Sequence, residues 1–140
     1  MVVIVGIGID LVNVAKFGAT VSRTPGFADS IFTHREMVDE FGERRTNASL
    51  AGRYAAKEAL AKAIGAPPGM HWHDCEVLVE PDGRPYLRTK GLLSEAAAEL
   101  GVATFHLSLA MEGDVAIAYV IAEGVSSLDG AASVRMSESA

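Results

Sequence analysis

A chain of 140 residues has room for one domain with a buried core. Apolar residues make up 49% of it and charged residues 21%, which is typical of a globular protein. The net charge of −6 argues against nucleic-acid binding as a default, and no apolar run is long enough to span a bilayer. The single Cys75 cannot form a disulfide within the chain, and residues 1–9 lack the basic start of a signal peptide. We therefore expect a cytoplasmic protein that binds neither nucleic acid nor membrane.

The first predicted element is a strand over residues 2–10, which are β-branched or apolar apart from two glycines and the final Asp10. Strict alternation places the odd-numbered residues 3–9 on one face and the even-numbered residues 4–10 on the other. The second face includes Gly6, Gly8 and Asp10, and its glycines leave room for a backbone or a ligand to come close. Two roles for Asp10 stay open: it caps a following helix, or it is a metal ligand on a rigid element. The Gly-x-Gly-x-Asp order is a poor match to a dinucleotide-binding loop, because no third glycine follows and the acid comes too early.

Helical patterns follow. A weak one covers residues 11–22, and the spacing of Thr33 and Glu36 is that of a capping box that opens a second helix. The third and longest helix is predicted over about 48–64, with Asn47 or Ser49 as its cap. The Gly- and Pro-rich run 65–69 ends it.

The third helix and the residues just before it carry most of the charged candidates. Five cations predict a local anion site on an otherwise acidic chain: Arg44, Arg45, Arg53, Lys57 and Lys62. Glu58 and Lys62 are four residues apart and so are neighbours on one helix face. One interpretation is a solvated face with an intrahelical ion pair that stabilises by about 0.2–0.5 kcal/mol. The other pairs Glu58 with Asp10 around a hard divalent cation, with the basic side chains holding phosphates.

Strands dominate the rest of the chain. A hairpin is predicted from 76–80 and 85–88, a short helix over 91–100, and a second strand pair from 103–110 and 115–123. The order of strand, helices and hairpins predicts an α+β fold. We expect a single domain over residues 1–124 and a disordered tail over 125–140.

His106 and Ser108 alternate with leucines, so both lie on one face of the predicted strand. A histidine in this setting is either a hydrogen-bonded, half-buried residue or, together with Ser108, part of a polar cleft.

Four segments resemble those of the holo-acyl-carrier-protein synthases, the bacterial 4′-phosphopantetheinyl transferase family. They are Gly6-Ile7-Gly8-Ile9-Asp10-Leu11-Val12, Arg53-Tyr54-Ala55-Ala56-Lys57-Glu58-Ala59 with Lys62-Ala63, Asp82-Gly83-Arg84-Pro85, and His106-Leu107-Ser108-Leu109. The resemblance covers residues 3–123. It implies the transferase-like α+β fold, in which an antiparallel sheet packs against a long central helix.

The resemblance also implies a reaction. The phosphopantetheine arm of coenzyme A would move to a serine of an apo acyl carrier protein, or of a carrier domain in a fatty acid synthase. In the family pattern, Asp10 and Glu58 bind Mg²⁺, and Glu58 or a metal-bound water takes the serine proton. Lys62 meets the pyrophosphate and completes the catalytic set. The expected coenzyme A contacts beyond Lys62 are Arg44, Arg45, Arg53, His106 and Ser108.

Members of this family are homotrimers with clefts between subunits, and their acidic carrier docks on a basic first helix, for which Lys16 and Arg23 are the candidates here. One departure is visible: Ala110-Met111 stands where the family usually has Ser/Thr-His. This motivates an alternative function, a coenzyme A or nucleotide-binding module with weak or no turnover. A purely structural trimeric subunit is a third possibility.

Overall fold

The computed structural model describes residues 1–126. Its elements follow in the order β1 (Val2–Asn13), α1 (Val14–Arg23), α2 (Phe27–Ile31), α3 (His34–Met37), α4 (Asn47–Ile64), the 3₁₀ helix η1 (Trp72–Asp74), β2 (Cys75–Val79), β3 (Pro85–Thr89), α5 (Gly91–Glu99), β4 (Val102–Glu112) and β5 (Val115–Val125). The predicted α+β class is confirmed.

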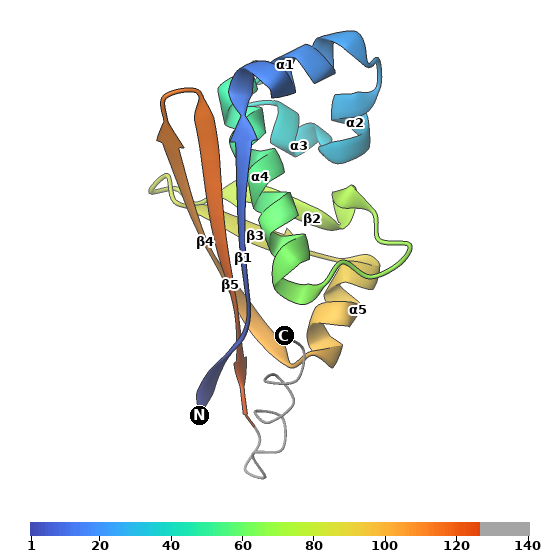
Figure 1. Ribbon diagram of the computed structural model, residues 1–140, viewed down its shortest axis with the longest axis vertical. Helices are drawn as coiled ribbons and strands as arrows, with labels where there is room; N and C mark the ends of the chain where they lie inside the picture. The colour runs from blue at the N-terminus through green and yellow to red at the C-terminus, as the bar shows by residue number, and fades with distance from the viewer. Residues whose placement is uncertain (127–140) are drawn as a thin grey trace.

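Two antiparallel sheets are present in this part of the chain. Three long strands form one in the order β1-β5-β4, and the β2–β3 hairpin forms the other. Helix α4 lies along one side of the three-stranded sheet, with α1 to α3 at one end of the molecule and α5 at the other (Figure 1). The expected arrangement of an antiparallel sheet against a long central helix is therefore present.

Strand β1 approaches α4 so closely that only glycine fits at two positions. A Cβ on Gly6 would lie 1.8 Å from the carbonyl oxygen of Ala63, and one on Gly8 would lie 1.8 Å from that of Ala59. The glycines thus make room for the helix backbone, which was one of the two uses predicted for them.

The alternation predicted for β1 is wrong at its start. The pairing of β1 with β5 shifts register between Ile4 and Gly6, and this bulge changes which residues face inward. Val5 packs on the core although the alternation placed it with Ile7 and Ile9, which are 54% and 48% exposed. Gly6, Gly8 and Asp10 keep a shared face, and that face is turned toward α4.

Two clusters make up the core. One joins α4 to the three-stranded sheet and the hairpin, through side chains such as Leu60, Val77 and Val120. The other joins α1 and α2 to the first half of α4, through Phe17, Phe32 and Leu50. Full burial of side chains of this size stabilises the fold by about 1.5–3 kcal/mol each.

Several predicted boundaries need correction. Strand β1 continues to Asn13, so residues 11–13 are strand rather than helix. The cap of α4 is Thr46 rather than Asn47 or Ser49, and its side chain accepts a hydrogen bond from the Ser49 amide. The capping box of Thr33 and Glu36 is confirmed, although the helix that it opens is only four residues long. Strand β5 runs through Val125, which was expected in the tail, and 127–140 of that tail lie outside the described residues. No helix within residues 1–126 is long and apolar enough to cross a membrane.

Candidate active site

Asp10 lies within β1, which is an edge strand of the three-stranded sheet, rather than at the end of that strand. It pairs across the sheet with Ala118, and β1 continues for three more residues before α1 begins. The cap of α1 is Asn13, whose side chain accepts a hydrogen bond of 2.9 Å from the Lys16 amide. The helix-capping interpretation of Asp10 is therefore wrong. The carboxylate instead follows the two glycines along the face that meets α4.

Lys62 reaches this carboxylate from α4. Its Nζ donates to Asp10 Oδ1 at 2.8 Å and to the Ile9 carbonyl oxygen at 3.1 Å. The hydrogen bond to Asp10 raises the pKa of Lys62, and the charges of Asp10 and Glu58 act in the same direction. Lys62 therefore pairs across to β1 instead of forming the intrahelical ion pair with Glu58. The fold thus brings Asp10 to Lys62, from which 52 residues separate it, and to the Glu58 charge one turn away on α4.

Tyr54, one turn before Glu58 on α4, also belongs to this group. Burial, then a hydrogen bond to Glu58 and the charges of Glu58 and Asp10, raise the pKa of Tyr54 to about 12. Its ring centroid lies 5.6 Å from that of Phe17 and 6.4 Å from that of Trp72. Tyr54 was not among the predicted site residues, although its spacing of four residues from Glu58 is the signal that would have found it.

The acids fit a hard divalent cation. Asp10 and Glu58 offer carboxylate oxygens near Lys62. Within residues 1–126, no cluster of three or more His, Cys, Asp or Glu side chains could hold a metal ion without other ligands. Magnesium characteristically uses one or two protein carboxylates together with waters and substrate phosphates. The carboxylates of Asp10 and Glu58 are ligands of this kind, and Lys62 lies beside Asp10.

Arg45 and Arg53 form a second positive group. Arg53 is 6% exposed and donates to Ser49 Oγ at 2.7 Å, but its Nε and that of Arg45 are buried without a hydrogen-bond partner among the described residues. Burial, then the charge of Arg45, lowers the pKa of Arg53 to about 10. Two neighbouring guanidinium groups with unused donors favour binding of an anion. Arg44 is exposed and lines a separate cavity of about 460 Å³ with Thr33 and His34.

Lys57 is not part of the predicted anion site. It is fully buried, its Nζ lies 2.7 Å from Glu36 Oε1, and it donates to the carbonyl oxygens of Ile31, Trp72 and Cys75. Every donor of its ammonium group is used inside the protein. This lysine ties α4 to the segments before α3 and around η1.

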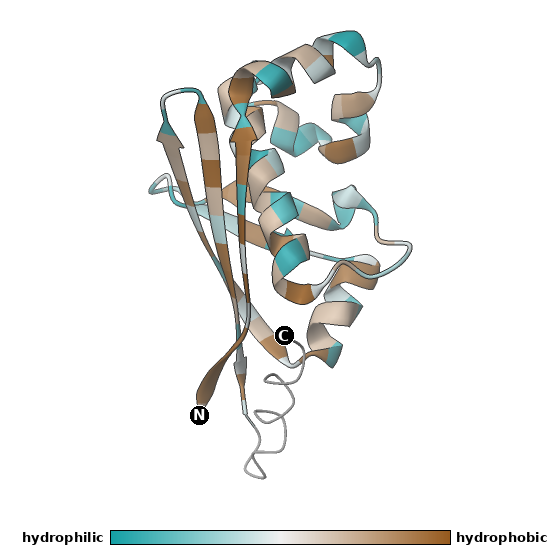
Figure 2. Ribbon diagram, viewed as in Figure 1, coloured by the Kyte–Doolittle hydropathy of each residue, from teal (hydrophilic) through white to brown (hydrophobic). Residues whose placement is uncertain are grey.

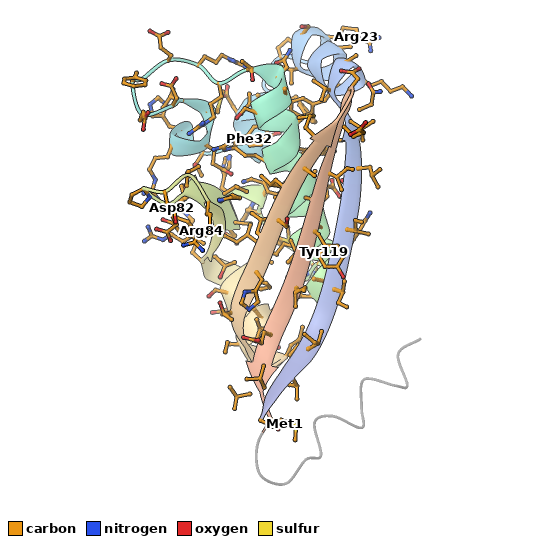
Figure 3. The ribbon with its side chains drawn as sticks, turned by 90° about the vertical axis from the view of Figure 1, so that its left-hand side faces the viewer. Met1, Arg23, Phe32, Asp82, Arg84 and Tyr119 are labelled. Atoms are coloured by element: carbon orange, nitrogen blue, oxygen red, sulfur yellow. The ribbon has the colours of Figure 1, made fainter. Side chains whose placement is uncertain are left out.

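His106 and Ser108 lie on the opposite face of the sheet from Asp10. Both are exposed on β4, and Ser108 is level with Tyr119, which lies on the outer face of the sheet (Figure 3). His106 Nε2 lies 3.3 Å from Glu123 Oε2. A cavity of about 700 Å³ separates the two residues from the hairpin turn, where Arg84 pairs with Asp82 at 2.8 Å. Within one chain, these two residues and the Asp10 group do not form one site.

Comparisons with known proteins identify the family of the chain. The family model of the 4′-phosphopantetheinyl transferase superfamily matches residues 6–120, so the chain belongs to this superfamily. The holo-[acyl-carrier-protein] synthase of Streptomyces avermitilis is 54% identical over 121 residues, which cover 86% of this chain and 98% of the relative. Within the superfamily, the chain is a member of the holo-[acyl-carrier-protein] synthases.

Solved structures give the same result for the fold. The holo-[acyl-carrier-protein] synthase of Neisseria meningitidis superimposes with a TM-score of 0.74 at 29% identity, covering 86% of this chain and 98% of that one. A complex of the Chronobacterium ammoniagenes enzyme with coenzyme A gives 0.69 at 28% identity, with the same coverage. The resemblance seen in the sequence motifs is thereby confirmed.

Proposed function

We propose that the chain transfers the 4′-phosphopantetheine arm of coenzyme A to a serine of an apo acyl carrier protein or carrier domain. One observation supports this most strongly. Asp10 and Lys62 are in contact, and Glu58 acts on the same lysine, although 52 residues separate Asp10 from Lys62. Two carboxylates beside a lysine suit phosphoryl transfer, in which positioning and charge neutralisation supply most of the catalysis.

In the proposed reaction, the serine oxygen bonds to the phosphorus on the pantetheine side of the pyrophosphate. The bond from that phosphorus to the bridging oxygen breaks, and adenosine 3′,5′-bisphosphate leaves with the electron pair. Glu58 accepts the serine proton, and Lys62 donates to the pyrophosphate oxygens as a point charge. A magnesium ion on Asp10 and Glu58 would neutralise charge at the attacked phosphorus and the leaving oxygen.

The remaining phosphate contacts are assigned to the arginines. We assign Arg45 and Arg53 to the 3′-phosphate of coenzyme A because a guanidinium group binds phosphate through forked hydrogen bonds. Arg44 is adjacent in the chain but lines a separate cavity, so its contact with coenzyme A stays a prediction.

We also propose the homotrimer. The outer face of the three-stranded sheet exposes Ile7 at 54%, Leu11 at 60% and Tyr119 at 39%, and Figure 2 colours much of β1 and β5 as hydrophobic. Exposed apolar patches of this kind mark interaction sites. His106 and Ser108 are on this face, so in a trimer of this kind they would lie at or near the contact with a neighbouring subunit. Sedimentation velocity tests this: a trimer is expected, and a stable monomer at micromolar concentration would contradict it.

The carrier is expected to dock on α1, where Lys16 and Arg23 are both exposed. Such cations steer an acidic partner toward a protein whose total charge is negative. We also propose a cytoplasmic location, where coenzyme A is available.

Mass spectrometry tests the proposed function. Incubation of apo carrier with the protein, Mg²⁺ and coenzyme A should add a phosphopantetheine group of about 340 Da to the carrier. Glu58→Gln and Asp10→Asn should abolish the mass gain while circular dichroism shows an unchanged fold. Full activity in both variants would refute the roles assigned to the two acids.

A second function is supported by one observation. Met111 is 47% exposed at the end of β4, where the family usually has a histidine. A module that binds coenzyme A without turnover would show coenzyme A binding by calorimetry but no mass gain on any carrier. A purely structural subunit would show neither.

A further inference from the structure

The contact between Lys62 and Asp10 involves the same carboxylate that is proposed to hold the ion. Lys62 Nζ lies 2.8 Å from Asp10 Oδ1, and its second hydrogen bond goes to the carbonyl oxygen of Ile9. The ammonium group is therefore seated over the edge of β1 where Asp10 projects. An ion bound to the same carboxylate would repel this ammonium group, because two cations close together destabilise each other.

The two partners differ in their freedom to move. The Asp10 side chain is 17% exposed, and its strand is held against α4 by Gly6 and Gly8. The Lys62 side chain is 55% exposed and is attached by four flexible carbons. An exposed ion pair of this kind is easily separated. Lys62 is thus the member of the pair that gives way.

We propose that Lys62 competes with the divalent cation for Asp10, and that binding of the ion transfers Lys62 from Asp10 to the substrate's pyrophosphate. This rests on the proposed function, and it goes further by making ion binding and phosphate binding one coupled event. A phosphate that attracts Lys62 frees Asp10 for the ion, and the ion releases Lys62 for the phosphate, since such coupling is reciprocal. The enzyme would therefore hold the ion weakly until coenzyme A arrives.

Titration of free Mn²⁺ by electron paramagnetic resonance tests this without turnover. In the absence of coenzyme A, Lys62→Met should bind Mn²⁺ roughly two- to fivefold more tightly than wild type, because the competing ammonium group is gone. Lys62→Arg retains the charge and the contact, so its affinity should equal or fall below that of wild type. The matched control is Lys90→Met, which removes the same charge from an exposed lysine at the start of α5 and should change nothing.

A second measurement follows the lysine itself. With ¹³C-labelled lysine, Mg²⁺ alone should shift the NMR signal of Lys62 while those of Lys16 and Lys90 stay in place. Equal or weaker Mn²⁺ binding by Lys62→Met, or an unmoved Lys62 signal at saturating Mg²⁺, would overturn the competition. If wild type then still modifies the apo carrier, only this inference fails. If wild type modifies no carrier, the proposed function fails with it.

Discussion

Two lysines five residues apart on α4 have opposite surroundings. Lys57 is fully buried with Glu36 and three backbone carbonyl groups, whereas the Lys62 side chain is 55% exposed and crosses to Asp10 on β1. The first lysine has no donor left for a ligand, and the second is held by a pair that is easily broken. The comparison shows that the helix face on which a lysine lies decides its role. On the face turned to the core it stabilises the fold, and on the face turned to β1 it is available to the candidate site.

The largest effect is expected at the buried pair. Lys57→Met should lower the free energy of unfolding by about 3–5 kcal/mol, because Glu36 is left as an uncompensated buried charge. Urea denaturation measures this. The double variant Lys57→Met with Glu36→Leu should recover only part of the loss: the buried charge is gone, but the amides of Thr33 and Val77 and the carbonyl oxygens that Lys57 bonded lose their partners. A single variant as stable as wild type would mean that Lys57 is not a structural tie.

The exposed pair should show the reverse behaviour. Lys62→Met should reduce the rate of carrier modification by about 100-fold, the loss typical when one donor to a reacting group is removed. Its urea midpoint should stay at the wild-type value, since a pair this exposed adds little stability. A Lys62→Met protein with normal turnover and a lowered midpoint would erase the contrast between the two lysines.

The contact between β1 and α4 connects the two regions. Gly8→Ala places a Cβ 1.8 Å from the Ala59 carbonyl oxygen, so strand and helix must move apart. We expect a loss of about 1–3 kcal/mol, as for other overpacked sites, and a slower transfer reaction because Asp10 moves away from Glu58 and Lys62. The control Gly52→Ala lies on α4 with no atom within 4 Å of the added Cβ, and it should be tolerated.

The smallest effect concerns Tyr54, whose pKa is raised to about 12 from 10.0. The folded state favours the neutral phenol, so the Tyr54 side chain contributes to the free energy of unfolding. This contribution is complete below pH 10 and is lost as the pH rises toward 12. Because the ring is only half-buried, the loss should remain under about 1 kcal/mol. Urea midpoints at pH 8 and pH 10.8 measure it. Tyr54→Phe should remove this part of the alkaline loss, and an identical pH dependence in both proteins would count against it.

Much of the architecture follows from local patterns. Some features involve only neighbours within a few residues and can therefore be predicted from the sequence alone. They are the hairpin around Asp82-Gly83, the capping box of Thr33 and the strand β5. The family motifs around Asp10 and Glu58 likewise predicted the chemistry correctly at the level of the enzyme class.

What the sequence did not reveal depends on contacts between distant segments. Helical spacing shows that Glu58 and Lys62 are neighbours, but not that Asp10 lies closer to the lysine. It cannot show that Lys57 points into the core, because the acceptors that make its burial tolerable come from Glu36 and from backbone carbonyl groups of α2, η1 and β2, up to 26 residues away.

By itself, the amino-acid order determined most of the elements, the α+β class and the charged groups, since these depend on short-range periodicity. The tertiary structure alone decided which of those groups meet. The bulge after Ile4 turns β1 so that Val5 joins the inward face, and the packing of Gly8 on Ala59 sets Asp10 beside α4. The outward direction of His106 was decided in the same way, because the face of a strand that is buried depends on what packs against it.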